Sequence, residues 1–104
     1  MLAESGKIYT GCNIENAAYS PTNCAERTAV FKAVSEGERD FLAIAVAGDG
    51  EGYLAPCGVC RQVLLEFCNP QEFLVLMVGK EQEFREMTLG ELLPASFSNK
   101  DLQK

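Results

Sequence analysis

Three cysteines and one glutamate have the types and spacing of a catalytic metal site. Cys24 is followed two residues later by Glu26, and Cys57 and Cys60 form a Cys-x-x-Cys pair further along the chain. Thiolates are ligands that Zn²⁺ prefers, and a catalytic zinc keeps its fourth position for water. A structural zinc would normally take a fourth Cys or His, and the chain contains no histidine. The pattern therefore predicts one zinc ion, bound by the three cysteines, with Glu26 beside it as the acid–base residue.

These residues also have plainer interpretations. Free cysteines are often small buried hydrophobes, and Glu26 could form a capping box with Asn23 as the N-cap residue. A Cys-x-x-Cys pair, a separate cysteine and an adjacent glutamate together favour the metal site and a catalytic Glu26. Cys12 and Cys68 have no such surroundings, so we predict that both serve only in packing.

Both parts of the site are expected at the start of a helix. Residues 20–23 (Ser-Pro-Thr-Asn) are a helix-start signal, and apolar residues then share one helical face at positions 25, 29, 30, 33 and 34. A second helix is predicted over about residues 58–68, because Asn69 and Pro70 follow. The partial positive charge of a helix N-terminus favours thiolates. The spacing of Cys57 and Cys60 points both sulfurs to one side.

Arg27 lies one turn beyond Cys24 on the same face of the first predicted helix. It could donate hydrogen bonds to thiolates and withdraw negative charge from a site that has three of them. It could equally be a solvated helix residue, and the sequence favours neither interpretation.

Two apolar segments predict strands in a buried sheet. Residues 41–47 and 73–78 are continuously apolar, as expected for strands buried on both faces. Joined through the second helix, they form a right-handed parallel crossover and so predict a layered α/β domain. Residues 7–12 predict a further short strand. The length of 104 residues suits one such domain, spanning residues 1–104.

Composition and charge exclude several kinds of partner. Nine Lys and Arg residues are scattered among fifteen Asp and Glu residues, for a net charge of −6, which argues against binding to nucleic acid. The longest apolar run is far too short to span a membrane, and the first residues do not form a signal peptide. We therefore expect a cytoplasmic protein whose five cysteines stay reduced.

Five stretches between Tyr9 and Leu102 together resemble the cytidine deaminases of the small, homotetrameric class with a three-cysteine zinc site. They are Gly-Cys-Asn-Ile-Glu-Asn-Ala-Ala-Tyr-Ser at 11–20, Cys-Ala-Glu-Arg-Thr-Ala at 24–29, Lys-Ala-Val-Ser-Glu-Gly at 32–37, Pro-Cys-Gly-Val-Cys-Arg-Gln at 56–62 and Leu-Leu-Pro-Ala-Ser-Phe at 92–97. The resemblance implies a three-layer α/β/α sandwich around a five-stranded mixed sheet. It also implies hydrolysis of cytidine and deoxycytidine to uridine and deoxyuridine in pyrimidine salvage.

The resemblance also implies a role for individual residues. It makes Cys24, Cys57 and Cys60 the zinc ligands, Glu26 the proton shuttle, Asn13, Glu15 and Ala25 substrate-binding residues, and Tyr19 and Phe97 residues that reach a neighbouring subunit's site. Asn13 and Glu15 would bind the ribose hydroxyls, since residues two apart in an extended segment face the same way and an amide with a carboxylate can both donate and accept. Ordinary loop capping is the alternative for that pair. Taken alone, Phe97 would be assigned to the core.

The resemblance places the family's first helix and most of its first strand, with a base-stacking phenylalanine, before Met1. Residues 1–3 then correspond to the tail of that strand, which lies between residues 7–12 and residues 41–47. Without the rest of the strand, both neighbours would present unpaired backbone groups. We therefore expect these 104 residues alone to fold poorly and to turn over cytidine weakly.

Two rival functions remain. One is deamination of a nucleoside antibiotic such as blasticidin S on the same fold, although Asn13 with Glu15 and the Leu-Leu-Pro at 92–94 favour the salvage enzyme. The other is a catalytically impaired zinc-binding fragment that only assembles with partner chains. Editing of nucleic acid is disfavoured by the acidic composition.

Overall fold

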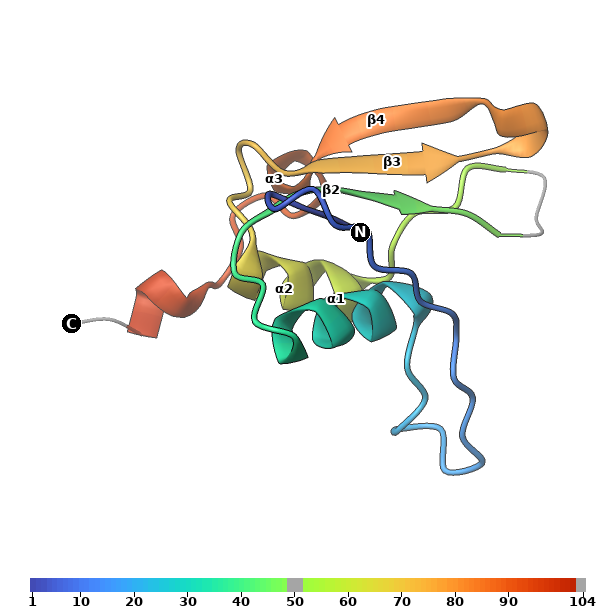
Figure 1. Cartoon of the computed structure of the whole chain (residues 1–104), viewed down its shortest axis with the longest axis horizontal. Coiled ribbons are helices and arrows are strands. Elements are labelled where there is room, and N and C mark those ends of the chain that lie inside the picture. The colour runs from blue at the N-terminus through green and yellow to red at the C-terminus, as the bar shows by residue number, and fades with distance from the viewer. Residues whose placement is uncertain (49–51, 103–104) are drawn as a thin grey trace.

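A mixed sheet with two helices on one face positions the site. The computed structural model describes residues 1–48 and 52–102. Among these residues the sheet has four strands, in the spatial order β1 (Leu2–Ala3), β2 (Phe41–Val46), β3 (Leu74–Val78) and β4 (Phe84–Thr88). Helices α1 (Ala25–Ser35) and α2 (Gly58–Phe67) lie side by side on one face (Figure 1). The shorter elements are η1 (Lys80–Gln82), α3 (Leu89–Leu92) and η2 (Asn99–Leu102).

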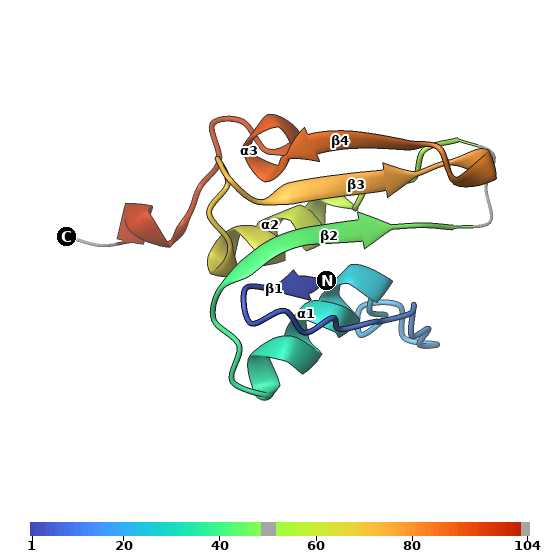
Figure 2. The ribbon, with the colours of Figure 1, turned by 45° about the horizontal axis from the view of Figure 1, so that its top comes forward.

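The segment β2–α2–β3 forms the predicted parallel crossover. β2 and β3 pair in parallel, with Ala43 opposite Leu74, and β1 and β4 flank them in antiparallel orientation (Figure 2). The α/β class and the mixed sheet are therefore confirmed. The core between sheet and helices is built from fully buried side chains of both layers, among them Val30, Leu64 and Val75.

The prediction that the central strands are buried on both faces is wrong. Along β3, Val75 and Met77 are buried, whereas Leu74, Leu76 and Val78 are only half-buried. The reason is that, in the described part of the chain, α1 and α2 both cover the same face of the sheet (Figure 1). The opposite face is therefore less completely shielded from water.

β1 lies where the resemblance places the tail of the family's first strand. It pairs with β2 on one side, and Leu2 bridges Ile8 on the other. The amino group of Met1 also donates to the carbonyl oxygen of Tyr9 at 3.0 Å. The strand predicted at residues 7–12 is reduced to this single bridge, because its partner β1 has only two residues. The described sheet therefore has one strand fewer than the resemblance implies.

Gly11 brings the segment that leads to the site directly against α1. A Cβ atom at this position would clash with the carbonyl oxygen of Ala25 and the backbone nitrogen of Ala29. Glycine is therefore required for this close approach of the two backbones. The contact places Asn13, two residues later, next to the first turn of α1.

Candidate metal and active site

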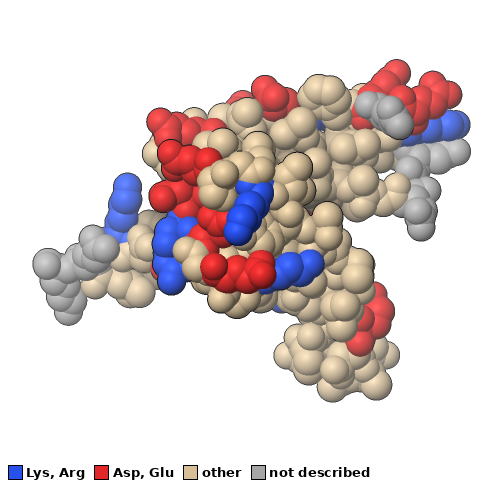
Figure 3. All heavy atoms as spheres, in the orientation of Figure 1, with Lys and Arg blue, Asp and Glu red and all other residues tan. Residues whose placement is uncertain are grey.

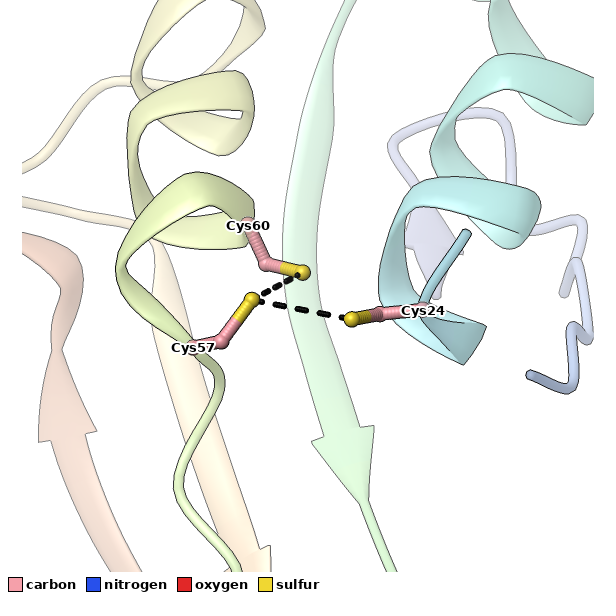
Figure 4. Close-up of side chains that lie close together, drawn as sticks. All are labelled: Cys24, Cys57 and Cys60. Carbon is pink, nitrogen blue, oxygen red and sulfur yellow. Dashed lines mark hydrogen bonds between the residues drawn. The ribbon is translucent and has the colours of Figure 1, made fainter. Parts of the chain in front are cut away.

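The three predicted ligand cysteines meet between the N-termini of α1 and α2. Cys24 is the N-cap residue of α1, Cys57 is the N-cap residue of α2, and Cys60 lies in the first turn of α2. Figure 4 shows their side chains pointing toward one another across the space between the two helices. The sulfur of Cys57 is 3.6 Å from that of Cys24 and 3.0 Å from that of Cys60.

These distances suit a zinc ion. All three sulfurs lie within 4.8 Å of one another. With zinc–sulfur bonds of about 2.3 Å, two sulfurs on a tetrahedral zinc stand about 3.8 Å apart. Small side-chain adjustments therefore convert the cluster into a zinc site, and the predicted ligand set is one that the fold brings together.

The three thiols can all ionise only if a cation binds between them. Burial raises the pKa of the Cys60 thiol, and its hydrogen bonds with Cys57 and Cys24 and the nearby Glu26 carboxylate act in the same direction. Burial opposes ionisation of Cys57 too, but hydrogen bonds from Cys60 and Cys24 and the charge of Arg27 outweigh it, so the pKa of Cys57 is lowered. One thiolate is thus favoured, and ionising three sulfurs this close together needs a positive charge between them.

Arg27 touches the cysteine cluster, as the first of its two interpretations predicts. Its Nη2 donates to the sulfur of Cys24 at 3.5 Å and to the carbonyl oxygen of Thr22 at 3.3 Å. The hydrogen bond to Cys24 is the main reason that the pKa of Arg27 is raised. Its Nε is buried and has no hydrogen-bond partner within residues 1–48 and 52–102. A thiolate-rich metal site suits this cation, since Arg27 can stabilise negative charge on sulfur.

Glu26 is buried beside the cluster and is not part of a capping box. Only 9% of its surface is exposed, and its carboxylate lies close enough to Cys60 to raise the pKa of that thiol. The N-cap residue of α1 is Cys24, without a side-chain capping bond, whereas the Asn23 side chain donates to the hydroxyl of Thr28. The alternative with Asn23 as N-cap is therefore wrong.

A cavity of about 340 Å³ opens beside Glu26. It lies between the segment that follows β1 and the edge of β2, and its walls are mostly apolar. Its volume falls within the range of small-molecule sites. Ala25, one of the predicted substrate-binding residues, lines this cavity next to Glu26. The lining residues are Met1, Ile8, Tyr9, Thr10, Gly11, Ala25, Glu26, Ala29, Ile44, Ala45, Val46 and Ala47.

The structure brings Asn13 to the site and leaves Glu15 further out along the same segment. The Oδ1 atom of Asn13 accepts a hydrogen bond from the backbone nitrogen of Ala25 at 2.8 Å. This bond caps the N–H group of Ala25 in the first turn of α1. It holds the side-chain amide of Asn13 next to Ala25, which stands between Cys24 and Glu26 in the sequence. The Asn13 NH₂ group is the part of the side chain that can donate to a ligand. Glu15 is exposed.

Tyr19 and Phe97 lie at opposite ends of the molecule. Tyr19 is 85% exposed near the tip of the projecting loop 12–23, and Phe97 is 62% exposed in the C-terminal segment. Figures 1 and 2 both show this loop and the C-terminal segment on opposite sides of the body. The assignment of Phe97 to the core is therefore wrong, because most of this residue is exposed.

The packing predicted for the remaining two cysteines holds for only one of them. Cys68 is buried and its pKa is raised to about 12 by burial. Cys12 is exposed, because it stands at the start of the projecting loop. Its carbonyl oxygen, accepting from the hydroxyl of Thr28 at 3.1 Å, makes the contact with α1.

Arg61 and Gln62 follow the ligand Cys60 directly, and their residue types alone predicted no role. Arg61 donates to the carbonyl oxygens of Pro56 and Leu92, and Gln62 donates to that of Phe97. The signal available in the sequence was their position directly after Cys60, within the stretch 56–62 that carries the resemblance.

Figure 3 shows Lys and Arg side chains lying beside Asp and Glu, rather than gathered into a basic patch, on the face in view. None of the described helices is long and apolar enough to cross a membrane.

Comparison with known proteins points in one direction. Residues 1–77 match the family model of the cytidine and deoxycytidylate deaminase zinc-binding region. A cytidine deaminase from Sporosarcina psychrophila is 57% identical over 102 residues, which span 98% of this chain and 74% of that protein. One from Halalkalibacterium halodurans is 48% identical, over 98% of this chain and 76% of that protein. The crystal structure of cytidine deaminase from Burkholderia pseudomallei superimposes with a TM-score of 0.87 at 45% identity, covering 92% of this chain and 76% of that one.

Proposed function

Since the chain belongs to the cytidine and deoxycytidylate deaminase family, we propose that it hydrolyses cytidine and deoxycytidine to uridine and deoxyuridine in pyrimidine salvage. The observation that carries this proposal is the meeting of three cysteine sulfurs with the buried carboxylate of Glu26. We place the reaction in the cytoplasm, because a reducing compartment keeps the ligand thiols available for metal.

The site places an acid–base group, Glu26, next to the cluster of three cysteines. Cys24, Cys57 and Cys60 would hold the zinc ion, which would supply Lewis-acid activation of the attacking water. Glu26 accepts a proton from the attacking water and delivers it to N3 of the cytosine ring. As the water oxygen bonds to C4, a hydroxyl group forms there; Glu26 takes its remaining proton and passes it to the 4-amino group, which leaves as ammonia while the C4–O bond becomes a carbonyl. The hydrogen bond from Arg27 to Cys24 stabilises the thiolate throughout.

We assign nucleoside binding to the side of Glu26 that faces the cavity. Ala25 and Glu26 line this cavity, and the rest of its lining comes largely from residues 8–11 and 44–47, between which the resemblance places the family's first strand. Asn13, held by its bond to Ala25, and Glu15, on the same extended segment, are assigned to the ribose hydroxyls. Carboxylate and amide groups can accept from and donate to those hydroxyls, respectively.

The ribose assignment predicts the effect of changing Glu15. Glu15→Ala should lower kcat/KM for cytidine by about 5- to 150-fold, the equivalent of leaving a hydroxyl group without its partner, while zinc content and the unfolding temperature stay unchanged. Asn13→Ala should lower kcat/KM as well and should also cost stability, because Asn13 caps α1. Steady-state kinetics with metal analysis measure both. Loss of zinc from Glu15→Ala would contradict the assignment and give this segment a purely structural role.

We further propose that the enzyme works as a homotetramer in which Tyr19 and Phe97 reach neighbouring active sites. In support, both rings are exposed and lie at opposite ends of the chain. The projecting loop 12–23 carries Glu15 as its only charged residue, and its exposed surface includes Ile14. Exposed aromatic and apolar side chains on a projecting loop suit contact with another copy of the chain.

Sharing of residues between subunits predicts complementation. The Glu26→Gln and Tyr19→Ala variants should each be weakly active alone. In hybrids formed by co-expression, a site is complete when one chain supplies Glu26 and its neighbour supplies Tyr19. Up to about a quarter of the sites should therefore be active. Cytidine turnover of tandem-tagged, purified hybrids measures this. Hybrids no more active than the separate variants would show that Tyr19 serves no neighbouring site.

A substrate comparison tests the proposed function. Purified protein, with zinc quantified in parallel, is offered cytidine, deoxycytidine and blasticidin S, and deamination is followed by ultraviolet absorbance. Turnover of the two nucleosides in proportion to zinc content is expected. Preference for blasticidin S would indicate the antibiotic deaminase, and full zinc without any turnover would indicate a binding fragment.

A further inference from the structure

Arg61 joins the metal-binding turn to the C-terminal part of the chain. It follows Cys60 in α2 and is half-buried. Its Nε donates to the carbonyl oxygen of Pro56 at 2.8 Å, and its Nη1 donates to the carbonyl oxygen of Leu92 at 2.9 Å. Pro56 is fully buried and directly precedes the ligand Cys57, and Leu92 is the last residue of α3. The guanidinium group of Arg61 therefore contacts both the metal-binding turn and the C-terminal part of the chain.

Gln62, the next residue, holds a second point of the C-terminal segment. Its Nε2 donates to the carbonyl oxygen of Phe97 at 2.9 Å. Between α3 and η2 the backbone is irregular, and Ala95 has a positive φ of 50°. Such a conformation is disfavoured for a residue with a Cβ atom and persists only where surrounding contacts hold it. Arg61 and Gln62 supply contacts on either side of Ala95.

The chemistry of arginine explains why one side chain can do both tasks. The guanidinium is planar and always charged, and its N–H groups point in fixed, divergent directions. A lysine has a single nitrogen and could not reach both carbonyl oxygens in the same geometry. The last carbonyl groups of a helix lack partners within it, so the bond to Leu92 also satisfies an acceptor of α3. The bond to Pro56 restrains the carbonyl group that enters the peptide bond with Cys57.

We propose that Arg61 is a positioning residue, which fixes the turn before Cys57 relative to residues 92–97 through its bonds to Pro56 and Leu92. Gln62 adds a second bond to this segment, at Phe97. The proposal rests on the zinc site of the proposed function. Zinc affinity and the placement of the C-terminal segment are then coupled through Arg61. Gln62, which contacts only the carbonyl group of Phe97, acts on the segment alone.

Metal binding measures this coupling without any use of catalysis. Zinc affinity is determined by competition with a chromophoric chelator, and Co²⁺ substituted for zinc reports the ligand geometry through its visible absorption. Arg61→Ala should weaken zinc binding about tenfold or more, within the range of other residues that support metal ligands from outside, and should shift the cobalt bands. Arg61→Lys should recover only part of the affinity, because it restores one bond of two.

The chain offers a matched control in Arg39. Its Nη1 also donates to two backbone carbonyl oxygens, those of Val34 and Glu38, but at the end of α1 that is remote from Cys24. Arg39→Ala should change zinc affinity by less than about twofold. Gln62→Ala should keep the cobalt spectrum of the parent and increase amide hydrogen exchange in residues 93–98.

Three outcomes would overturn the proposal. The first is zinc affinity within about twofold of the parent, with unchanged cobalt bands, in Arg61→Ala. The second is an equal loss of affinity in Arg39→Ala, which would show general destabilisation. The third is a parent that binds no zinc. If Arg61→Ala fails to fold, the folded Arg61→Lys decides by the same two measurements. A parent that binds zinc tightly but never deaminates cytidine contradicts only the proposed function.

Discussion

Glu26→Gln is expected to bind zinc and fold like the parent and to lose about 10²–10⁴-fold or more in kcat, the usual contribution of a general acid–base group. The physical reason is that glutamine has nearly the same shape but cannot take up and release protons. One carboxylate serves several proton transfers in the proposed reaction, so the loss should lie at the upper end. Stopped assays at high enzyme concentration measure the residual rate, and metal analysis confirms the zinc content.

Glu36, an acidic residue at the opposite end of α1, provides the control variant for Glu26→Gln. Glu36 follows α1 as its C-cap residue and is exposed, so Glu36→Gln removes the same charge at a distance from the cluster. It should retain parental kcat. Activity of Glu26→Gln within tenfold of the parent would contradict the proton-transfer role, and it would leave the buried carboxylate as a packing feature.

Replacing any one of the three clustered cysteines should empty the metal site. Cys24→Ala, Cys57→Ala and Cys60→Ala each leave two sulfurs where three lie within 4.8 Å of one another. Two thiolates do not satisfy a tetrahedral zinc, so we expect less than about a tenth of the parental zinc after dialysis, with deaminase activity lost in parallel. Inductively coupled plasma analysis of purified protein measures the metal directly.

Cys12 and Cys68 are the matched controls for the cysteine series. Cys12→Ala should retain both zinc and stability, because Cys12 is exposed. Cys68→Ala should retain zinc but lose about 1 kcal/mol of unfolding free energy, because it leaves a small cavity in the core. Full zinc in Cys60→Ala, or loss of zinc in Cys12→Ala, would mean that the ligands have been assigned incorrectly.

The sequence by itself determined the parts of this protein that depend on short-range patterns. Cys57 and Cys60 lie one helical turn apart whatever surrounds them, and the apolar segments around Ile44 and Val75 specify strands that a helix must connect in parallel. Helix limits followed from local signals as well: α1 begins at Ala25, close after the start signal at residues 20–23, and α2 ends at Phe67, one residue before the predicted end.

Only the tertiary structure determined which long-range contacts form between these elements. Side-chain patterns do not reveal which distant backbone group a side chain will contact, so the capping of Ala25 by Asn13 and the two bonds of Arg61 could be found only in the folded chain. The same holds for the single bridge at Ile8, which depends on the length of its partner strand. Phe97 is 62% exposed, and hydrophobicity alone could not show that.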